Sequence, residues 1–217
     1  MPDNVNDFIS NERKDFGFAE LGDLTGIDDP LTLVHAWLKD AIDRNAPEAY
    51  AFTLSTVSSS GYPASRVVYA RNLSSEGIIF YTNYNSRKGK EITLSAKACG
   101  LFFWPLQERQ IRFEGMIEKI SGKESDEYFA GRPRDNQLGA WASNQSEKIQ
   151  SRKELEEKMA ALDAKYKDMS VPRPPHWGGY RIKPVYFEFW QGRPGRLHDR
   201  LVFEKEKSGW KIFRISP

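Results

Sequence analysis

The amino-acid sequence predicts a mainly β fold, an antiparallel barrel with helices at its periphery. Many short strand-like runs follow one another, and turn residues separate them at close intervals. Few helical segments intervene, whereas a parallel sheet would need a crossover helix between successive strands. Aromatic residues make up 13% of the chain, which is enough to build a core although 29% of the residues are charged. At 217 residues the chain is long enough for one barrel domain.

The N-terminal residues 1–28 are polar, mixed in charge and weakly patterned. We expect them to form a mobile arm in front of a single domain that spans residues 29–217. The first helix of this domain begins at Asp29, an acidic N-cap, with Pro30 at the first helical position. The apolar positions that recur behind it at helical spacing, and that predict its buried face, are Leu31, Val34, Leu38 and Ile42.

The strands are predicted from the change to period-two alternation after the first helix. The expected ranges are Ala51–Val57, Tyr62–Asn72, Gly77–Thr82, Cys99–Trp104, Gln110–Ile120, Gly179–Trp190, Leu197–Glu206 and Trp210–Ile215. Helices are expected after two capping-box sequences, Ser121–Glu124 and Ser151–Glu154. The second of these helices places Leu155, Met159, Leu162 and Tyr166 on one face and charges elsewhere.

Composition excludes several classes of function. A net charge of +2 is too balanced for a nucleic-acid-binding protein, so we expect no nucleic-acid partner. Cys99 is the only cysteine, and three scattered histidines form no zinc motif, so neither a disulfide nor a metal site is expected. No signal peptide and no apolar run long enough for a bilayer are seen. The expected location is therefore cytoplasmic, without a membrane partner.

Signature motifs of other enzyme classes are also missing. The sequence has no Gly-x-Gly-x-x-Gly dinucleotide fingerprint and no Walker A loop. It has no nucleophile elbow either, although residue order alone leaves a Ser-His-Asp triad open.

The stretch most informative about function is Phe189–Arg200, Phe-Trp-Gln-Gly-Arg-Pro-Gly-Arg-Leu-His-Asp-Arg. Its glycines and proline predict a turn between two strands. The turn carries Arg193, Arg196, His198 and the final arginine close together. Guanidinium groups so close repel one another unless anions lie among them, and a ligand is one source of such anions.

Three further basic segments are candidate binding sites. Strand alternation places Arg66 and Arg71 on opposite faces of one predicted strand, so we expect them to contact different groups. Ser86–Lys90 combines two cations with the start of a short helix, which is a favourable place for a phosphate. Arg132–Arg134, interrupted by a proline, predicts an exposed and stiffened basic turn.

The stretch Phe189–Arg200 resembles the C-terminal signature of the pyridoxamine 5′-phosphate oxidase family, FMN enzymes that make pyridoxal 5′-phosphate. The resemblance extends in order from about Asp29 to Pro217. It implies an FMN-binding split barrel and a homodimer in which two chains share two flavin sites. It also implies oxidation of pyridoxamine 5′-phosphate and pyridoxine 5′-phosphate by O2, with release of H2O2.

The resemblance assigns roles to individual positions. Those that match FMN-binding positions are Arg66, Val67, Val68, Tyr69, Ala70, Arg71, Tyr81, Thr82, Arg87, Lys88, Gln110, Gln145, Ser146, Trp190 and Arg200. Those that match substrate-binding positions are Arg71, Tyr128, Arg132, Asn136, Arg196, Leu197 and His198. Of these, Arg196 and His198 are the expected catalytic residues, which orient the substrate ring and stabilise changing charge.

The chain departs from the family pattern at a few positions. Arg71 stands where the family usually has Lys, and Asn136 where it commonly has Ser. In the arm, which can fold over the active site in the family, Arg13 matches an expected arginine. Phe16 stands near the place of an expected tyrosine.

Two alternatives stay open at this stage. One is a related split-barrel flavoprotein with another substrate, such as a phenazine-pathway oxidase or a flavin reductase. Tyr128, Arg132 and the run Arg196–His198 favour the vitamin B6 substrates instead. The other is a non-catalytic carrier of FMN or pyridoxal phosphate, which turnover with peroxide release would exclude.

Overall fold

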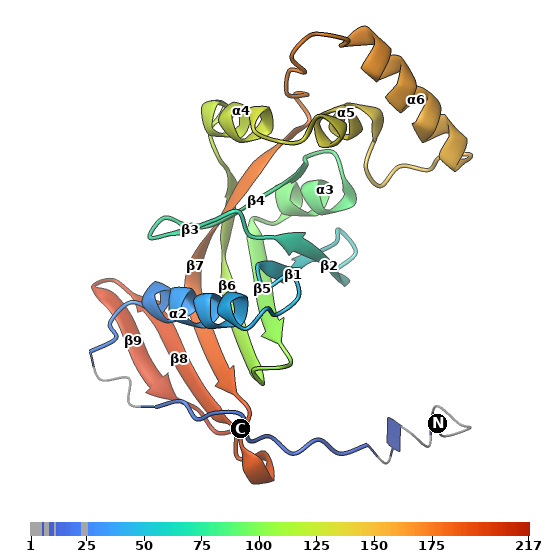
Figure 1. Ribbon diagram of the computed structural model, residues 1–217. Helices are drawn as coiled ribbons and strands as arrows, with labels where there is room; N and C mark the ends of the chain where they lie inside the picture. Colours follow the sequence, from blue (N-terminus) through green and yellow to red (C-terminus); the bar gives the residue numbers. More distant parts are fainter. Residues whose placement is uncertain (1–5, 7–8, 11, 23–25) are drawn as a thin grey trace.

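The computed structural model describes residues 6, 9–10, 12–22 and 26–217 (Figure 1). Parts of the expected arm, residues 1–5, 7–8, 11 and 23–25, lie outside the described residues. The strands are β1 (Ala51–Val57), β2 (Pro63–Tyr69), β3 (Asn72–Ser74), β4 (Gly77–Asn83), β5 (Lys97–Trp104), β6 (Arg109–Lys119), β7 (Trp177–Gln191), β8 (Asp199–Glu206) and β9 (Gly209–Arg214).

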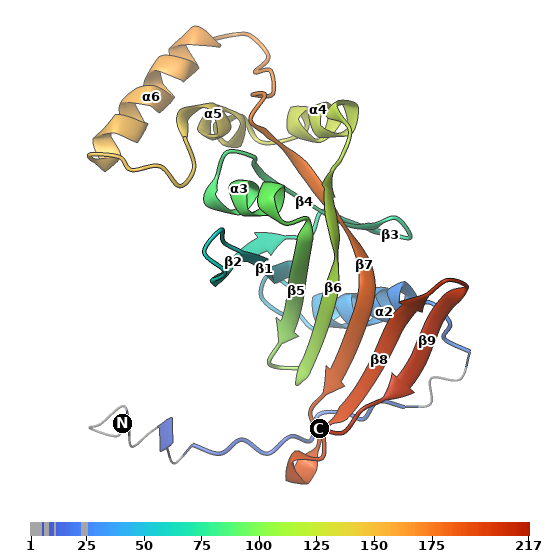
Figure 2. The same ribbon diagram turned by 180° about the vertical axis from the view of Figure 1, so that it is seen from behind.

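These strands form one antiparallel sheet, as the sequence predicts. The order is β2-β1-β5-β6-β7-β4-β3, and β8 pairs with β7 and with β9. In Figures 1 and 2 the sheet curls around α2 (Pro30–Asp43), and β8 and β9 lie beside the end of β7 that is farther from the other helices. The expected barrel-like β architecture with peripheral helices is therefore confirmed.

Helix α2 begins as predicted, because the Asp29 carboxylate accepts a hydrogen bond from the Leu31 backbone N–H at 3.0 Å. Its buried face was only partly predicted. Ile42 is 52% exposed, and Trp37 is buried instead, with its ring 5.4 Å from that of Phe189 in an edge-to-face contact. The large indole anchors the helix on the sheet and turns the predicted stripe partly toward solvent.

The second predicted strand is wrong in its extent. We expected one strand over Tyr62–Asn72, but β2 ends at Tyr69. The Ala70 N–H still donates to the carbonyl of Tyr50, the residue just before β1, whereas the Arg71 N–H donates to the Ile79 carbonyl of β4 at 2.8 Å. The chain thus changes partner strand here, and side-chain alternation does not continue through Ala70 and Arg71.

The core of the sheet is aromatic. Phe52 packs against Phe80, Phe102 and Phe113 with ring centroids 5.4–6.0 Å apart. These four rings are 0–1% exposed. They come from four different strands, so aromatic packing holds the curled sheet together.

The remaining helices gather at the other end of β6 and β7 (Figure 1). They are α3 (Arg87–Leu94), α4 (Gly122–Ala130), α5 (Arg134–Ala142) and α6 (Arg152–Lys165). The capping box at Ser121 is confirmed, whereas the Ser151 side chain makes no capping hydrogen bond. Here the Glu154 carboxylate bonds to the Gln150 N–H and pairs with Lys158 instead.

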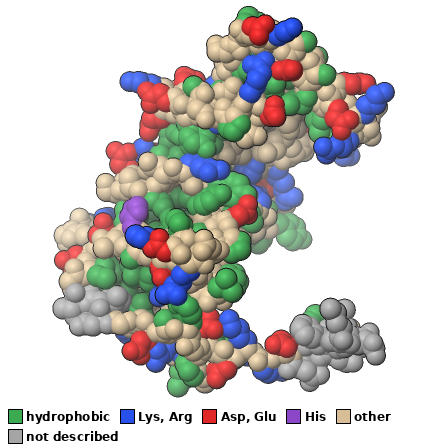
Figure 3. All heavy atoms as spheres, viewed as in Figure 1, with side chains coloured by type: hydrophobic (Ala, Val, Ile, Leu, Met, Phe, Trp, Pro, Cys, Tyr) green, Lys and Arg blue, Asp and Glu red, His purple; other side chains and the backbone are tan. Residues whose placement is uncertain are grey.

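Helix α5 was not expected, because Pro133 and the basic residues around it were interpreted as a turn. In the structure Pro133 is the N-cap of α5. The predicted apolar face of α6 is only partly buried: Met159 and Leu162 pack against a buried cluster, and the buried Tyr166 is the C-cap that follows the helix. Charges of both signs cover the outer surface of these helices (Figure 3). Within the described residues, no helix has the length and apolar character that a membrane span requires.

Candidate functional site

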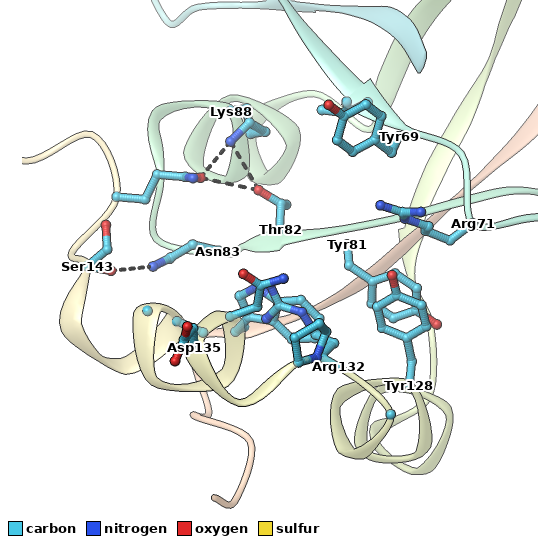
Figure 4. A pocket seen from close by; sticks show the side chains of 18 of the residues that line it. Tyr69, Arg71, Tyr81, Thr82, Asn83, Lys88, Tyr128, Arg132, Asp135 and Ser143 are labelled. Atoms are coloured by element: carbon cyan, nitrogen blue, oxygen red, sulfur yellow. Dashed lines mark hydrogen bonds between the residues drawn. The ribbon is translucent and has the colours of Figure 1, made fainter. Parts of the chain in front are cut away.

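A cavity of about 1110 Å³ lies where β2 and β4 meet α3, α4 and α5 (Figure 4). It gathers many of the predicted site residues: Arg66, Val67, Val68, Tyr69, Arg71, Tyr81, Thr82, Lys88, Tyr128, Arg132, Asn136 and Gln145. Arg66 and Arg71 line the same cavity. The expectation that they face apart is therefore wrong, because β2 ends between them.

Sequence reasoning missed the other lining residues. They are Asn83, Glu127, Gly131, Pro133, Asp135, Gly139, Ala140, Ser143 and Trp177. Most lie on or beside α5. A signal for this helix was present, since Leu138 and Ala142 are spaced by four residues and both are buried.

One end of the cavity is formed by Lys88 in the first turn of α3. The Ser86 hydroxyl caps this helix by accepting a hydrogen bond from the Gly89 N–H. The Lys88 ammonium donates to Gln145 Oε1 at 2.7 Å and to Thr82 Oγ1 at 3.0 Å, as Figure 4 shows. Burial, and then the neighbouring Arg66, lower the pKa of Lys88 to about 8. A helix start with a half-buried cation suits an anionic group.

The other end of the cavity holds two arginines that aromatic rings support. The Arg71 guanidinium lies 5.3 Å from the ring of Tyr50 and 5.1 Å from that of Tyr69. Arg132 lies 4.4 Å from the Trp177 ring, and its buried Nη1 has no hydrogen-bond partner among the described residues. Ring faces stabilise a cation without neutralising it, so both guanidiniums can still bind an anion.

A stack of three aromatic rings lines the cavity beside this second end. Tyr81 lies on Tyr128 with centroids 3.7 Å apart and 6° between the planes, and on Trp177 at 5.4 Å and 11°. Burial, followed by the neighbouring Tyr128, raises the pKa of Tyr81 to about 12, so this phenol is neutral at physiological pH. The cavity therefore has two cationic ends with a neutral aromatic wall.

The predicted residues of the C-terminal corner are not in this cavity. Trp177 lines it, but Trp190 lies near the other end of the same strand β7, which has 15 residues. At about 3.3 Å per residue such a strand spans roughly 45 Å. Figures 1 and 2 both place the 3-10 turn η1 (Pro194–Arg196) at the end of β7 opposite α4 and α5. The residues at or beside this corner are Gln110, Trp190, Arg196, Leu197, His198 and Arg200.

The backbone of the corner adopts a conformation that is uncommon for residues other than glycine. Arg196 has φ +64°, the left-handed region that costs energy for a residue other than glycine. The Arg193 N–H donates to His198 Nδ1 at 3.1 Å, so a neutral imidazole carries its proton on Nε2. Burial, and then the charge of Arg196, lower the pKa of His198. The histidine is thus held neutral with an N–H donor.

Protein carboxylates supply most of the anions expected among the corner arginines. Arg200 pairs with the buried Glu188 at 2.7 Å. Arg193 pairs with Glu20 at 3.0 Å. The Arg196 side chain is exposed and lies beside Leu197, which is 75% exposed. These exposed side chains leave the corner open toward a further partner.

Residues 16–18 of the arm lie against this corner, whereas the described residues nearer the N-terminus extend away from it (Figures 1 and 2). Phe16 meets Trp190 and His198 edge-to-face, with centroids 5.6 and 5.1 Å apart. The Glu108 carboxylate accepts hydrogen bonds from the backbone N–H groups of Gly17 and Phe18, both at 2.9 Å. Arg13 is exposed and bonds to the adjacent Glu12 carbonyl. The mobility expected for residues 1–28 stays a prediction.

Besides Gln110, Trp190 and Arg200 at the corner, three more predicted FMN-binding residues do not line the cavity. Ala70 is buried, and Ser146 is exposed with φ +74°. The Arg87 side chain is 64% exposed and pairs with Glu91. Across the described residues, no cluster of three or more His, Cys, Asp or Glu could hold a metal ion.

The chain matches two family models. Residues 38–166 match the model described as pyridoxamine 5′-phosphate oxidase. Residues 177–217 match the one described as pyridoxine 5′-phosphate oxidase C-terminal dimerisation region. This second match begins at Trp177 and so contains all of β7, the corner and the two last strands.

Curated relatives and solved structures agree with these matches. A pyridoxine/pyridoxamine 5′-phosphate oxidase from Paraburkholderia phytofirmans is 47% identical over 212 residues, which are 96% of this chain and 99% of the relative. One from Cyanothece sp. is 45% identical over 209 residues, 96% and 98% of the two chains. The structure of PhzG from Burkholderia lata 383, in complex with tetrahydrophenazine-1-carboxylic acid, is 32% identical and has a TM-score of 0.86 over 93% of this chain and 100% of PhzG.

A pyridoxamine 5′-phosphate oxidase-related, FMN binding protein from Nostoc punctiforme shares the fold. It has a TM-score of 0.70 at 18% identity, over 87% of this chain and 98% of that one. These likenesses confirm the expected split-barrel fold. With two family models over most of its length and relatives 45–47% identical over 96% of it, the chain belongs to the pyridoxamine 5′-phosphate oxidase family.

Proposed function

We propose that this protein uses FMN to oxidise pyridoxamine 5′-phosphate and pyridoxine 5′-phosphate with O2, giving pyridoxal 5′-phosphate and H2O2. The observation that carries the proposal is the cavity with two separate cationic ends, in a chain of this oxidase family. A flavin phosphate and a substrate phosphate each need a cationic partner. The volume of about 1110 Å³ lies at the upper end of the range typical of ligand pockets, which is compatible with a large ligand such as FMN.

The Lys88 end suits the phosphate of FMN. Lys88 stands at a helix start beside Arg66, and Gln145 and Thr82 supply neutral hydrogen-bonding groups. The arginine end suits the substrate phosphate, because Arg71 and Arg132 meet there and one buried N–H of Arg132 has no partner among the described residues. Tyr128 and Asn136 line the same end of the cavity.

The corner residues complete the site from a second chain. Because β7 separates Arg196 and His198 from the cavity of their own chain, these residues reach a cavity only in a homodimer. The match of residues 177–217 to a dimerisation region supports this arrangement. Two chains related by a twofold axis would then make two equivalent sites.

Within such a site, bound FMN would supply the redox chemistry, as the acceptor of the substrate's hydride. The chain's own residues bind and orient the ring. His198 donates a hydrogen bond from Nε2–H, since its Nδ1 already accepts one from Arg193. Arg196 places a positive charge beside the substrate, which stabilises negative charge that develops during reaction. In this geometry the neutral His198 is a donor and not a proton acceptor.

A second candidate is a phenazine-pathway oxidase, because the fold matches that of PhzG closely. The two cationic ends separate the candidates, since Arg71 and Arg132 suit a phosphate-bearing substrate. The test is to incubate the purified protein with FMN and pyridoxine 5′-phosphate in air. Aldehyde and peroxide are expected, with little reaction of unphosphorylated pyridoxine. Bound FMN without any aldehyde would contradict the proposed oxidase and support the carrier alternative.

The cytoplasmic location expected from the sequence is likewise a proposal. Cell fractionation of the source organism, with the oxidase activity as the readout, tests it.

A further inference from the structure

Behind the Lys88 end of the cavity lies a buried carboxylate that no sequence motif singled out. Glu91 is on the inner side of α3, and its side chain is 4% exposed. Its Oε2 accepts hydrogen bonds from Thr56 Oγ1 at 2.5 Å and Arg66 Nη2 at 2.9 Å. Its Oε1 accepts one from Arg87 Nε at 2.8 Å. Glu91 therefore connects α3 with both β1 and β2.

The same network fixes the orientation of Arg66. Its Nη1 donates to Thr56 Oγ1 at 2.5 Å and to the Leu54 carbonyl at 3.2 Å, while Nη2 is held by Glu91. Arg66 is 20% exposed and lines the cavity. A long side chain held at both terminal nitrogens has lost its rotamer freedom before any ligand arrives. The arginine is thus preorganised toward the cavity.

Glu91 also acts on Lys88 through charge. Burial lowers the pKa of Lys88 most, Arg66 lowers it further, and Glu91 raises it, with the result that it is about 8. Burial by itself would raise the pKa of Glu91, but hydrogen bonds from Thr56, Arg87 and Arg66 bring it below its ordinary value. Glu91 is therefore ionised and offsets the repulsion between the two cations. The other charged groups that line the cavity are Arg71, Glu127, Arg132 and Asp135.

We propose that Glu91 is a positioning residue for the phosphate-binding end of the cavity: it aims Arg66 and keeps Lys88 protonated beside it while no phosphate is bound. Glu91 does not line the cavity, so it acts through Arg66 and Lys88. This inference rests on the proposed FMN site.

The role predicts how FMN affinity changes with pH. Lys88 binds the phosphate in its protonated form, so affinity should be highest below pH 8 and fall as the pH rises through 8. Above about pH 6 the FMN phosphate is already a dianion, so its own titration does not interfere. Riboflavin has no phosphate and should show no such fall.

The test measures binding of FMN and riboflavin to the full-length apoprotein by flavin fluorescence between pH 6.5 and 9.5. Glu91→Gln keeps the shape of the side chain but removes its charge. We expect FMN to bind roughly tenfold more weakly at pH 7, with riboflavin unchanged. The pH at which FMN affinity begins to fall should move down by about one unit, because the favourable charge is lost.

Controls separate this role from general stability and from the proposed FMN site. Glu156→Gln changes another arginine-paired helical glutamate, on the surface of α6, and should alter the affinity for neither FMN nor riboflavin. If Glu91→Gln does not fold, Glu91→Asp decides the matter, since it keeps the charge but shortens the reach toward Arg66. It should weaken FMN binding roughly tenfold and leave riboflavin binding unchanged.

The outcomes that would overturn the proposal differ from those that would overturn the proposed function. A folded Glu91→Gln protein with wild-type FMN affinity and an unmoved pH dependence would show that Glu91 has no positioning role. Equal weakening of FMN and riboflavin would show a structural role only. Wild-type protein that binds FMN no better than riboflavin would instead contradict the phosphate site itself.

Discussion

Trp177 and Trp190 belong to the same strand, yet Trp177 lines the large cavity and Trp190 packs against His198 at the far corner, with ring centroids 4.7 Å apart. One extended strand thus separates the two groups of predicted site residues within a chain. The separation is fixed by backbone geometry, since the ladders with β6 and β4 together hold β7 extended from Trp177 to Gln191. The cavity of one chain lacks the expected catalytic residues Arg196 and His198, and the corner lacks the residues expected to bind the two phosphates.

Binding of FMN through its phosphate should depend on Lys88. Lys88→Gln removes one charged hydrogen-bond donor, which is worth about 1.5–3 kcal/mol. FMN should then bind roughly tenfold to a hundredfold more weakly at pH 7, and riboflavin should bind as before. Lys90→Gln is a matched control, because Lys90 is in the same helix but is exposed and outside the cavity lining. Equal loss in both variants would contradict a specific role of Lys88.

Binding of the substrate through its phosphate should depend on Arg71. Arg71→Ala should raise KM for pyridoxine 5′-phosphate roughly tenfold to a hundredfold with a smaller effect on kcat. Arg71→Lys keeps the charge but not the flat group that lies over Tyr50 and Tyr69, so KM should rise a few-fold. Steady-state kinetics with an FMN titration measure both effects. Loss of FMN binding with an unchanged KM would show that the residue serves the cofactor.

His198 should be neutral over most of the physiological range. Because burial and Arg196 lower its pKa, its titration midpoint should lie below the ordinary 6.5. NMR of the imidazole, assigned by comparison with His198→Gln, gives this midpoint. Arg196→Gln should move it upward by removing the nearby positive charge. A midpoint above 6.5 in the wild-type protein would contradict the neutral donor.

The packing under the cavity should tolerate no added methyl group at Gly178. A Cβ there would lie 2.1 Å from the Tyr84 hydroxyl oxygen and 3.0 Å from Ser125 Oγ. Gly178→Ala should therefore lower the free energy of unfolding by about 1–3 kcal/mol. In Gly139→Ala the new methyl group meets no atom within 4 Å, so this helical control should be neutral or stabilising in the ligand-free protein. Denaturant unfolding measures both.

Much of the fold could be predicted because its signals are local. Asp29 and Pro30 define the start of α2, and alternating side chains define most strands. The break after Tyr69 could not be predicted in this way, because it results from a change of hydrogen-bonding partner from β1 to β4. Helix α5 was missed because Pro133 and Gly139 weaken its local pattern.

The site was predictable as a set of residues but not as an arrangement. The motif around His198 and the basic residues near Lys88 carry the family resemblance. Nothing in the linear sequence indicates that β7 holds them apart. Glu91 was missed for a related reason, since its importance depends on the contacts of Arg66 across two strands and a helix.

In the proposed homodimer, each site combines the cavity of one chain with the corner of its partner. Arg132→Ala disables every cavity, and His198→Ala disables every corner, so each variant alone should have little activity. In a mixed dimer, one site combines both defects and the other is intact. Random mixing in equal amounts makes half of the dimers mixed, so about one quarter of the wild-type activity should return.

The decisive measurement is aldehyde formation by mixed dimers, isolated through two different affinity tags after co-refolding of the two variants. The shared-site account predicts activity that neither variant shows alone, close to half of the wild-type value per isolated mixed dimer, because one of its two sites is intact. Mixed dimers that form but stay as inactive as their parents, or a monomer that turns over, would contradict it.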